Sequence, residues 1–312
     1  MYLLGYDIGS SSVKASIVDA ESGKCAASAF YPKSEAPIIA VKKGWAEQEP
    51  SSWWEYLKQA TADILAASGA DPKDIKAIGI SYQMHGLVCV DKDMNVLRPS
   101  IIWCDSRAVP YGQKAFETLG ESHCLSHLLN SPGNFTASKL AWVKENEPEN
   151  FAKIAKIMLP KDYLAYKLTG VHSTDYSDAS GMLLLDVKNK RWSKELCEIC
   201  SVKPEWLPTL AESYEVVGTV RSEFNLPNAV VTAGAGDNAA AAIGTGTVNG
   251  GDCNISLGTS GTVFIAQNDF SVDQNNSLHS FAHANGKYHL MGCVLSAASC
   301  NKWWMEQVLQ TA

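Results

Sequence analysis

Two short turns rich in glycine and hydroxyl residues could bind phosphate. Gly9-Ser10-Ser11-Ser12 and Gly258-Thr259-Ser260 each join two apolar runs of the kind that form strands. Small residues let a backbone approach an anion closely and present N–H groups and hydroxyls to it. If both hairpin tips face a shared cleft, they can bind a chain of phosphates between them. The alternative is a chance likeness between two short turns.

Two aspartates occupy positions where strands are expected to end. Asp7 interrupts an apolar segment, where an unpaired carboxylate is costly unless a cation or hydrogen-bond donors meet it. Asp237 follows an apolar run and Gly236 and opens an expected helix, which places it at the carboxyl end of a strand, where α/β folds bind ligands. The plain alternatives are a turn-forming role for Asp7 and a helix N-cap for Asp237.

A further group of candidate residues follows other expected strands. Met84 and His85 lie on the loop after an apolar strand, although a lone histidine is more often structural. Trp103 has an aromatic face of the type on which sugars stack, but most tryptophans belong to the core. Asp105 could bind a ligand, and pairing with Arg107 is the plainer interpretation.

The elements that must position these residues indicate an α/β fold. Periodicity and turn residues predict strands at 3–8, 13–18, from 25, and at 76–81, 87–90, 96–103, 229–233, 253–257 and 262–266. The strands at 87–90 and 96–103 are expected to be joined by a turn at 91–95. Helices are expected from Ser52 to Gly69, with Ser52 as cap, and at 110–119, 136–146, 148–156, 159–168 and 239–243. The order β-β-β-α-β at the start indicates a sheet in which a helical crossover leads to a parallel strand.

Length and composition bound the possibilities. At roughly 150 residues per domain, 312 residues suggest about two domains, and we expect them at 1–244 and 245–312, with the glycine-dense run 244–251 as the hinge. Lys and Arg number 26 against 33 Asp and Glu, so the formal charge of −7 argues against nucleic acid or an anionic membrane as partner.

Cysteine usage and the N-terminus indicate where the chain functions. The 9 cysteines are scattered and odd in number, which favours reduced thiols. The first residues lack the basic start of a secretory signal, and no run is long and apolar enough to span a bilayer. We expect a cytoplasmic protein; a homodimer is left open.

Seven stretches resemble, in order along the chain, the motifs of a known group. Asp7-Ile8-Gly9-Ser10-Ser11-Ser12-Val13-Lys14 resembles the first phosphate motif of the sugar kinase, actin and Hsp70 ATPase superfamily, and 257–261 resembles its second. The narrower resemblance is to the FGGY carbohydrate kinases and, within them, to the xylulose kinase branch. It rests on 83–86, 98–107, 159–164, 175–181 and 236–240.

This resemblance implies a fold and a reaction. The fold would be a ribonuclease-H-like (actin-like ATPase) domain, a mixed sheet flanked by helices, followed by the start of a second similar domain across a catalytic cleft. The family's second domain normally runs well beyond the second phosphate hairpin, so most of it would be absent from these 312 residues. The reaction moves the γ-phosphoryl group of ATP onto a sugar hydroxyl with Mg²⁺, most closely D-xylulose to D-xylulose 5-phosphate.

The resemblance also assigns roles by position. Asp237 would be the general base and Asp7 the Mg²⁺-associated acid. The ketose would be bound by Met84, His85, Trp103, Asp105, Asp237 and Asn238, and the ATP phosphates by Gly9, Ser10, Ser11, Lys14, Gly258, Thr259 and Ser260. For Lys14, a solvated strand lysine is an alternative.

Other functions stay open at this stage. Ribulose, fuculose or gluconate could replace xylulose, because side-chain placement decides the stereochemistry of single hydroxyls. The chain could also be a non-catalytic sugar-binding fragment, or an actin-like or Hsp70-like ATPase, although the stretch 83–86 argues against the last.

Overall fold

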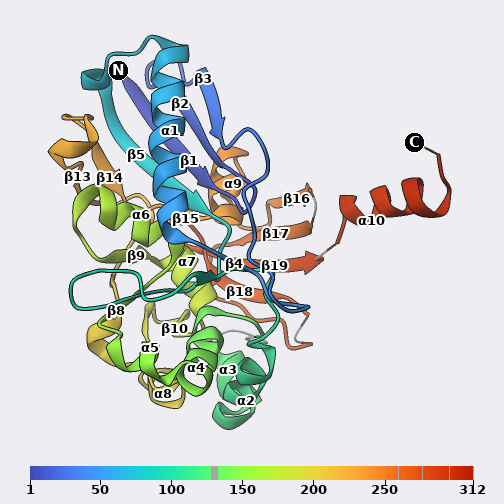
Figure 1. Ribbon diagram of the computed structural model, residues 1–312. Helices are drawn as coiled ribbons and strands as arrows, with labels where there is room; N and C mark the ends of the chain where they lie inside the picture. The colour runs from blue at the N-terminus through green and yellow to red at the C-terminus, as the bar shows by residue number, and fades with distance from the viewer. Residues whose placement is uncertain (128–132, 259, 276, 295, 312) are drawn as a thin grey trace.

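A central mixed sheet of seven strands organises the computed structural model, which describes residues 1–127, 133–258, 260–275, 277–294 and 296–311 (Figure 1). Its strands are β1 (Tyr2–Ile8), β2 (Val13–Asp19), β3 (Cys25–Tyr31), β5 (Ile75–Tyr82), β13 (Val216–Thr219), β14 (Val230–Thr232) and β15 (Ala235–Gly236). β1, β2 and β3 are antiparallel neighbours, whereas β5 pairs parallel with β1 on one side and with β14 and β15 on the other. β13 pairs antiparallel with β14. The predicted β-β-β-α-β order is therefore confirmed.

One long helix provides the crossover to β5. α1 (Pro50–Ser68) packs on β2 and β3 through side chains spaced three to four residues apart, including the fully buried Trp53 and Leu57. The helix begins at Pro50 rather than at the predicted Ser52, because proline at the first helical position needs no N–H partner there. It ends, as predicted, at Gly69, which has a left-handed φ of 66°.

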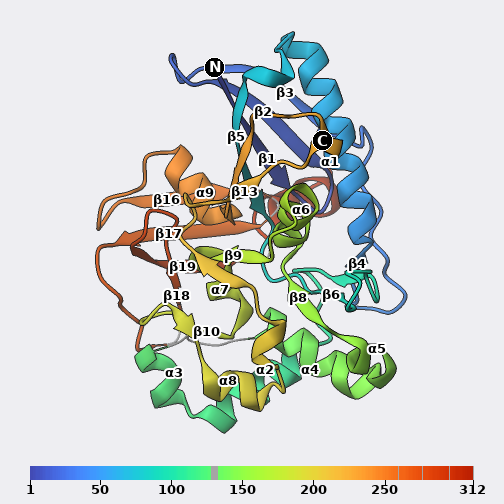
Figure 2. The ribbon, with the colours of Figure 1, turned by 90° about the vertical axis from the view of Figure 1, so that its left-hand side faces the viewer.

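A second, four-stranded antiparallel sheet has the order β16-β17-β19-β18 (Figure 2). Its strands are β16 (Cys253–Leu257), β17 (Gly261–Gln267), β18 (His279–Ala282) and β19 (Tyr288–Val294). α9 (Asp237–Gly244) connects the two sheets and packs against β17, where Phe264 is buried with the small residues of the helix. Phe281 of β18 instead belongs to the main core, so the two sheets share buried surface.

Helices gather at the end of the molecule remote from the N-terminus (Figure 1). The remaining α-helices are α2 (Val109–Leu119), α3 (Glu121–His127), α4 (Thr136–Asn146), α5 (Pro148–Lys153), α6 (Pro160–Thr169), α7 (Tyr176–Ala179), α8 (Lys194–Ile199) and α10 (Ala298–Trp303), the last projecting away from the body. Among the described residues, no helix combines the length and the apolarity that crossing a membrane requires.

Short strand pairs tie distant segments together, and they correct one expectation. They are β4 (Glu47–Gln48) with β7 (Ser100–Ile101), β6 (Val88–Val90) with β8 (Lys156–Met158), β9 (Ser173–Asp175) with β12 (Thr209–Ala211), and β10 (Leu185–Asp186) with β11 (Arg191–Trp192). The predicted strands at 87–90 and 96–103 do lie antiparallel across the turn at 91–95, with bridges from Leu87 to Ile101 and from Val90 to Val96. The second strand was predicted too long, because regular pairing is confined to Ser100–Ile101, and β6 and β7 each also pair with a remote strand.

Candidate active site

The two candidate aspartates lie at the same edge of the central sheet. Asp7 pairs in register with Ser81 of β5, and Ser81 pairs with Ala235 of β15. All three strands run parallel, so their carboxyl ends meet at one edge, and a spacing of about 4.8 Å between strands puts the backbones of Asp7 and Ala235 about 10 Å apart. Asp237 starts α9 directly after β15. The register therefore brings two acids 230 positions apart to one edge.

Asp237 lies at the first position of α9 and is not its N-cap. Gly236 occupies the cap position, and the Asp237 carboxylate accepts hydrogen bonds from the backbone and side-chain nitrogens of Asn238, at 2.7 and 2.9 Å. Burial raises the pKa of Asp237 to about 6, and the negative charge of Asp7 adds to that rise while the hydrogen bonds of Asn238 oppose it. A carboxyl group with this pKa is suited to accept a proton near neutral pH.

The Asp7 carboxylate is partly exposed to solvent. Its side chain is 40% exposed, accepts a hydrogen bond from Ser81 Oγ at 3.3 Å, and pairs with Lys14 Nζ at 3.2 Å across the β1–β2 hairpin. Lys14 is itself 60% exposed, so both charges are available to a ligand at this edge. Such a carboxylate fits Mg²⁺, which usually binds one or two carboxylates together with substrate phosphates and water.

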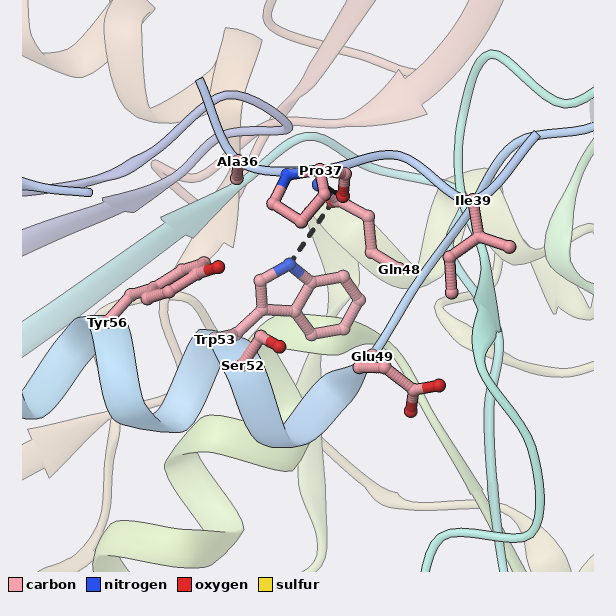
Figure 3. Close-up of a pocket in the computed structure, with 8 residues that line it drawn as sticks. All are labelled: Ala36, Pro37, Ile39, Gln48, Glu49, Ser52, Trp53 and Tyr56. Atoms are coloured by element: carbon pink, nitrogen blue, oxygen red, sulfur yellow. Dashed lines mark hydrogen bonds between the residues drawn. The ribbon is translucent and has the colours of Figure 1, made fainter. Parts of the chain in front are cut away.

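The first hairpin turn is held by Gln48 of β4, which is itself hydrogen-bonded to Trp53 of α1 (Figure 3). Gln48 Nε2 donates to Ser10 O at 2.7 Å, and Trp53 Nε1 donates to Gln48 Oε1 at 3.3 Å. Ala36 N donates to Ser11 O at 2.7 Å, and Gly9 N to the Ser12 carbonyl at 3.0 Å. A small cavity of about 40 Å³ lies beside these contacts, between Trp53 and the 36–39 segment. The carbonyls of Ser10, Ser11 and Ser12 therefore each accept a hydrogen bond from the protein.

The second hairpin begins beside Asp237. Thr262 Oγ1, at the foot of β17, donates to Asn238 Oδ1 at 2.9 Å. Gly258 N donates to the Ser260 carbonyl at 2.9 Å, and Leu257 pairs with Gly261, so the loop has three residues where the first hairpin has four. Thr259, predicted to bind phosphate, lies outside the described residues.

The loop after β5 adopts an unusual backbone. Met84 and His85 both have positive φ angles, 55° and 61°, a conformation that side chains other than glycine rarely adopt and that tends to occur at functional sites. A Cβ on Gly236 would lie 2.9 Å from Met84 Sδ, and one on Gly181 would lie 2.6 Å from His85 Nδ1. These two glycines therefore let the loop approach Asp237, and the structure brings Met84 and His85 to the same site.

The other two ketose candidates are engaged in structural contacts. Asp105 is fully buried, accepts from Ala46 N at 2.6 Å, and forms a bidentate ion pair with Arg107. This is the plainer of its two interpretations. Trp103 is half-buried outside the core cluster, and its carbonyl accepts a hydrogen bond from Asn134 at 3.1 Å.

Sequence reasoning missed a buried charged cluster next to the site. Lys161 Nζ lies 2.7 Å from Asp162, 2.9 Å from Asp175 and 3.7 Å from Asp178, and all four side chains are buried. Asp178 has no hydrogen-bond partner among the residues that the structure describes, and its burial, together with the neighbouring acids, raises its pKa. The charged pair Lys161-Asp162 between apolar residues at 159–164 was the signal that could have found it.

Comparisons with known proteins agree with this arrangement. Residues 2–244 match the profile described as the FGGY family of carbohydrate kinases, N-terminal domain. A xylulose kinase from Klebsiella pneumoniae is 39% identical over 310 residues, covering 97% of this chain and 62% of that protein, and one from Bacillus subtilis is 36% identical over 314 residues, covering 97% and 61%.

Solved structures extend the comparison. A structure described as a xyloylose kinase from Brucella ovis superposes with a TM-score of 0.90 at 37% identity, covering 99% of this chain and 63% of its own. A gluconate kinase from Lactobacillus acidophilus gives 0.89 at 28% identity, covering 99% and 62%. The chain belongs to the FGGY family of carbohydrate kinases, and the ribonuclease-H-like expectation for its fold is confirmed. It spans about 62% of the length of the curated relatives it matches.

Proposed function

We propose that this chain carries the sugar site and part of the nucleotide site of an ATP-dependent kinase that converts D-xylulose to D-xylulose 5-phosphate. The single observation that carries the proposal is the shared strand edge, where the register of β1, β5 and β15 brings Asp7 and Asp237 together. The xylulose kinases among its relatives support the choice of ketose.

Asp237 would act as the general base. A carboxylate at this site accepts the proton of the sugar hydroxyl while the hydroxyl oxygen attacks the γ-phosphorus of ATP, and ADP leaves with the electrons of the broken bond. The pKa of about 6 lets Asp237 be ionised at neutral pH and still bind a proton. Met84 would pack on the carbon skeleton beside it, and His85 would bind a hydroxyl.

The hairpins and Asp7 would bind the nucleotide end. Gly9, Ser10 and Ser11 on the first turn, with Lys14, and Gly258, Thr259 and Ser260 on the second would contact the ATP phosphates. Mg²⁺ held near Asp7 would offset the negative charge of those phosphates. The exposed position of the Asp7 carboxylate supports this role.

We further propose a boundary after Gly244, where α9 ends and the second sheet follows. That sheet exposes three apolar side chains to solvent, those of Ile255, Leu257 and Val263. In the longer relatives, the additional length would cover this face and complete the adenosine site. All 9 cysteines are free thiols, which supports the cytoplasm as the compartment.

Two other substrate assignments are outcomes of the same test. The gluconate kinase among the structural relatives supports a sugar acid as the first alternative substrate of this site. A polyol is the second.

The experiment is an ADP-release screen across ketoses, polyols and gluconate, run on this chain and on a version extended by a complete second domain. We expect ADP to form only when D-xylulose is present. We expect the extended version to form it at the full rate and this chain to form it more slowly or not at all. ADP formation without sugar would identify a sugar-independent ATPase. Ketose binding by calorimetry with no ADP from either version would identify a binding fragment.

A further inference from the structure

The strained loop after β5 is held in place by the N-terminal end of one helix. Met84 and His85 both have positive φ values, 55° and 61°, and Gly86 follows them. Such a backbone persists only where surrounding groups over-determine it. α4 (Thr136–Asn146) supplies these groups from its first turn and from the residue before it.

Lys139 contributes a buried amine to this contact. Its Nζ donates a hydrogen bond to the backbone carbonyl of His85, and its side chain is fully buried. Burial lowers the pKa of Lys139 to about 7, while the charges of Asp105 and Cys104 act in the opposite direction and that of Arg107 reinforces the lowering. An amine accommodated at such a cost needs acceptors, and the His85 carbonyl is one of them.

Two neighbours of Lys139 contact the same loop. The Phe135 ring stacks on the His85 ring, with centroids 4.3 Å apart and planes 10° apart. Thr136 Oγ1 donates to the Gly86 carbonyl at 3.2 Å. Positions 135, 136 and 139 fall on one side of the first helical turn, so a single rigid element contacts His85 and Gly86 at three points.

The same end of α4 also reaches the second candidate sugar loop. Asn134 Nδ2 donates to the carbonyl of Trp103 at 3.1 Å and to that of Asp105. The loops at 84–86 and 103–105 are therefore fixed relative to each other through one short segment.

We propose that the segment 134–139 is a clamp for the ketose site, in which Lys139 is a positioning residue that holds the backbone of His85 in its left-handed conformation. The proposal rests on the proposed function, because it assigns a purpose to the loop only if His85 contacts the sugar. Lys139 itself does not touch the reacting atoms.

The Gly181 carbonyl, which lies outside the clamp, determines which nitrogen of His85 carries the proton. His85 Nδ1 lies 2.9 Å from the Gly181 carbonyl, and since a carbonyl only accepts, Nδ1 must carry the proton. Burial lowers the pKa of His85 to about 3, so the ring is neutral and Nε2 is a hydrogen-bond acceptor. A sugar hydroxyl is the matching donor. Release of the His85 backbone would let the ring turn and lose this acceptor.

The test compares Lys139→Met with Lys144→Met, which removes an exposed lysine from the same helix. Isothermal calorimetry with D-xylulose measures affinity on the full chain, and hydrogen exchange measures the peptide covering 83–87. We expect Lys139→Met to weaken ketose binding about 10- to 100-fold, because it leaves the buried His85 carbonyl without its donor, and to speed exchange of that peptide. Lys144→Met should change neither.

A second pair of variants covers the case in which Lys139→Met fails to fold. Thr136→Val removes the hydroxyl at nearly constant shape, and Thr136→Ser keeps it. The clamp requires faster exchange of 83–87 in Thr136→Val and recovery in Thr136→Ser. If both lysine variants bind and exchange like the wild type, or both threonine variants do, the clamp is wrong. If the wild type binds no ketose, the proposed function fails, and the exchange data alone decide on the clamp.

Discussion

The ionisation of Asp237 sets a pH dependence that can be measured in two ways. Its pKa is about 6 in the folded chain against an ordinary 3.8, so the unfolded chain loses this proton first as pH rises. Folding therefore loses stability between about pH 4 and pH 6 through this group. In catalysis, the base becomes available over the upper part of the same range.

The corresponding variant is Asp237→Asn. We expect turnover to be abolished and D-xylulose binding to be largely retained, because the amide keeps the shape and an oxygen for the Asn238 nitrogens. Its unfolding free energy should exceed that of the wild type at pH 8 and equal it near pH 4, measured by urea denaturation. Retained turnover would remove Asp237 from its role, and an equal stability at pH 8 would contradict the raised pKa.

The cation of the buried cluster should matter far more than a surface cation. Lys161→Met leaves Asp162, Asp175 and Asp178 without their shared partner, and we expect a loss of about 3–5 kcal/mol in the free energy of unfolding. Lys58→Met, which breaks an exposed pair with Glu55, should cost about 0–1 kcal/mol. Both free energies of unfolding are measured by urea denaturation at pH 7. Similar losses in the two variants would show that the stability of the fold does not depend on the cation of the buried cluster.

At the scale of elements, the irregular backbone at Ala233 and Gly234, between β14 and β15, positions Asp237 at the site. Gly234 has a left-handed φ of 78°, and a Cβ there would clash with the backbone carbonyl of Ile80. We expect Gly234→Ala to cost about 1–2 kcal/mol for the conformation alone, with more from the clash. Gly244→Ala at the end of α9 meets nothing within 4 Å and should leave stability nearly unchanged. Thermal denaturation of both variants tests this, and an unchanged Tm for Gly234→Ala would contradict it.

At the scale of the whole molecule, the two sheets should unfold together. Ser180 Oγ accepts from Ala282 N of β18 at 3.0 Å, Lys190 Nζ donates to the Gly286 carbonyl at 2.7 Å, and Thr262 bonds to Asn238. Phe281 is buried in the main core. We expect one calorimetric transition with equal calorimetric and van't Hoff enthalpies. Two separate transitions would mean that the proposed boundary at Gly244 divides independent units.

The amino-acid sequence by itself determined the strands, the hairpin turns and the long helix, because alternation, small-residue turns and helical spacing act over a few residues. β1, β2 and β5, and the end of α1 at Gly69, were predicted on that basis. Its motifs also determined the family, since their order along the chain is itself information.

Only the tertiary structure decided which distant residues meet. It paired β6 with β8, placed Lys139 against the carbonyl of His85, and put Lys161 among three acids. The physical reason is that hydrogen bonding, burial and the resulting pKa values depend on neighbours supplied by remote parts of the chain. No local pattern around His85 could reveal a helix some fifty residues later that holds its backbone.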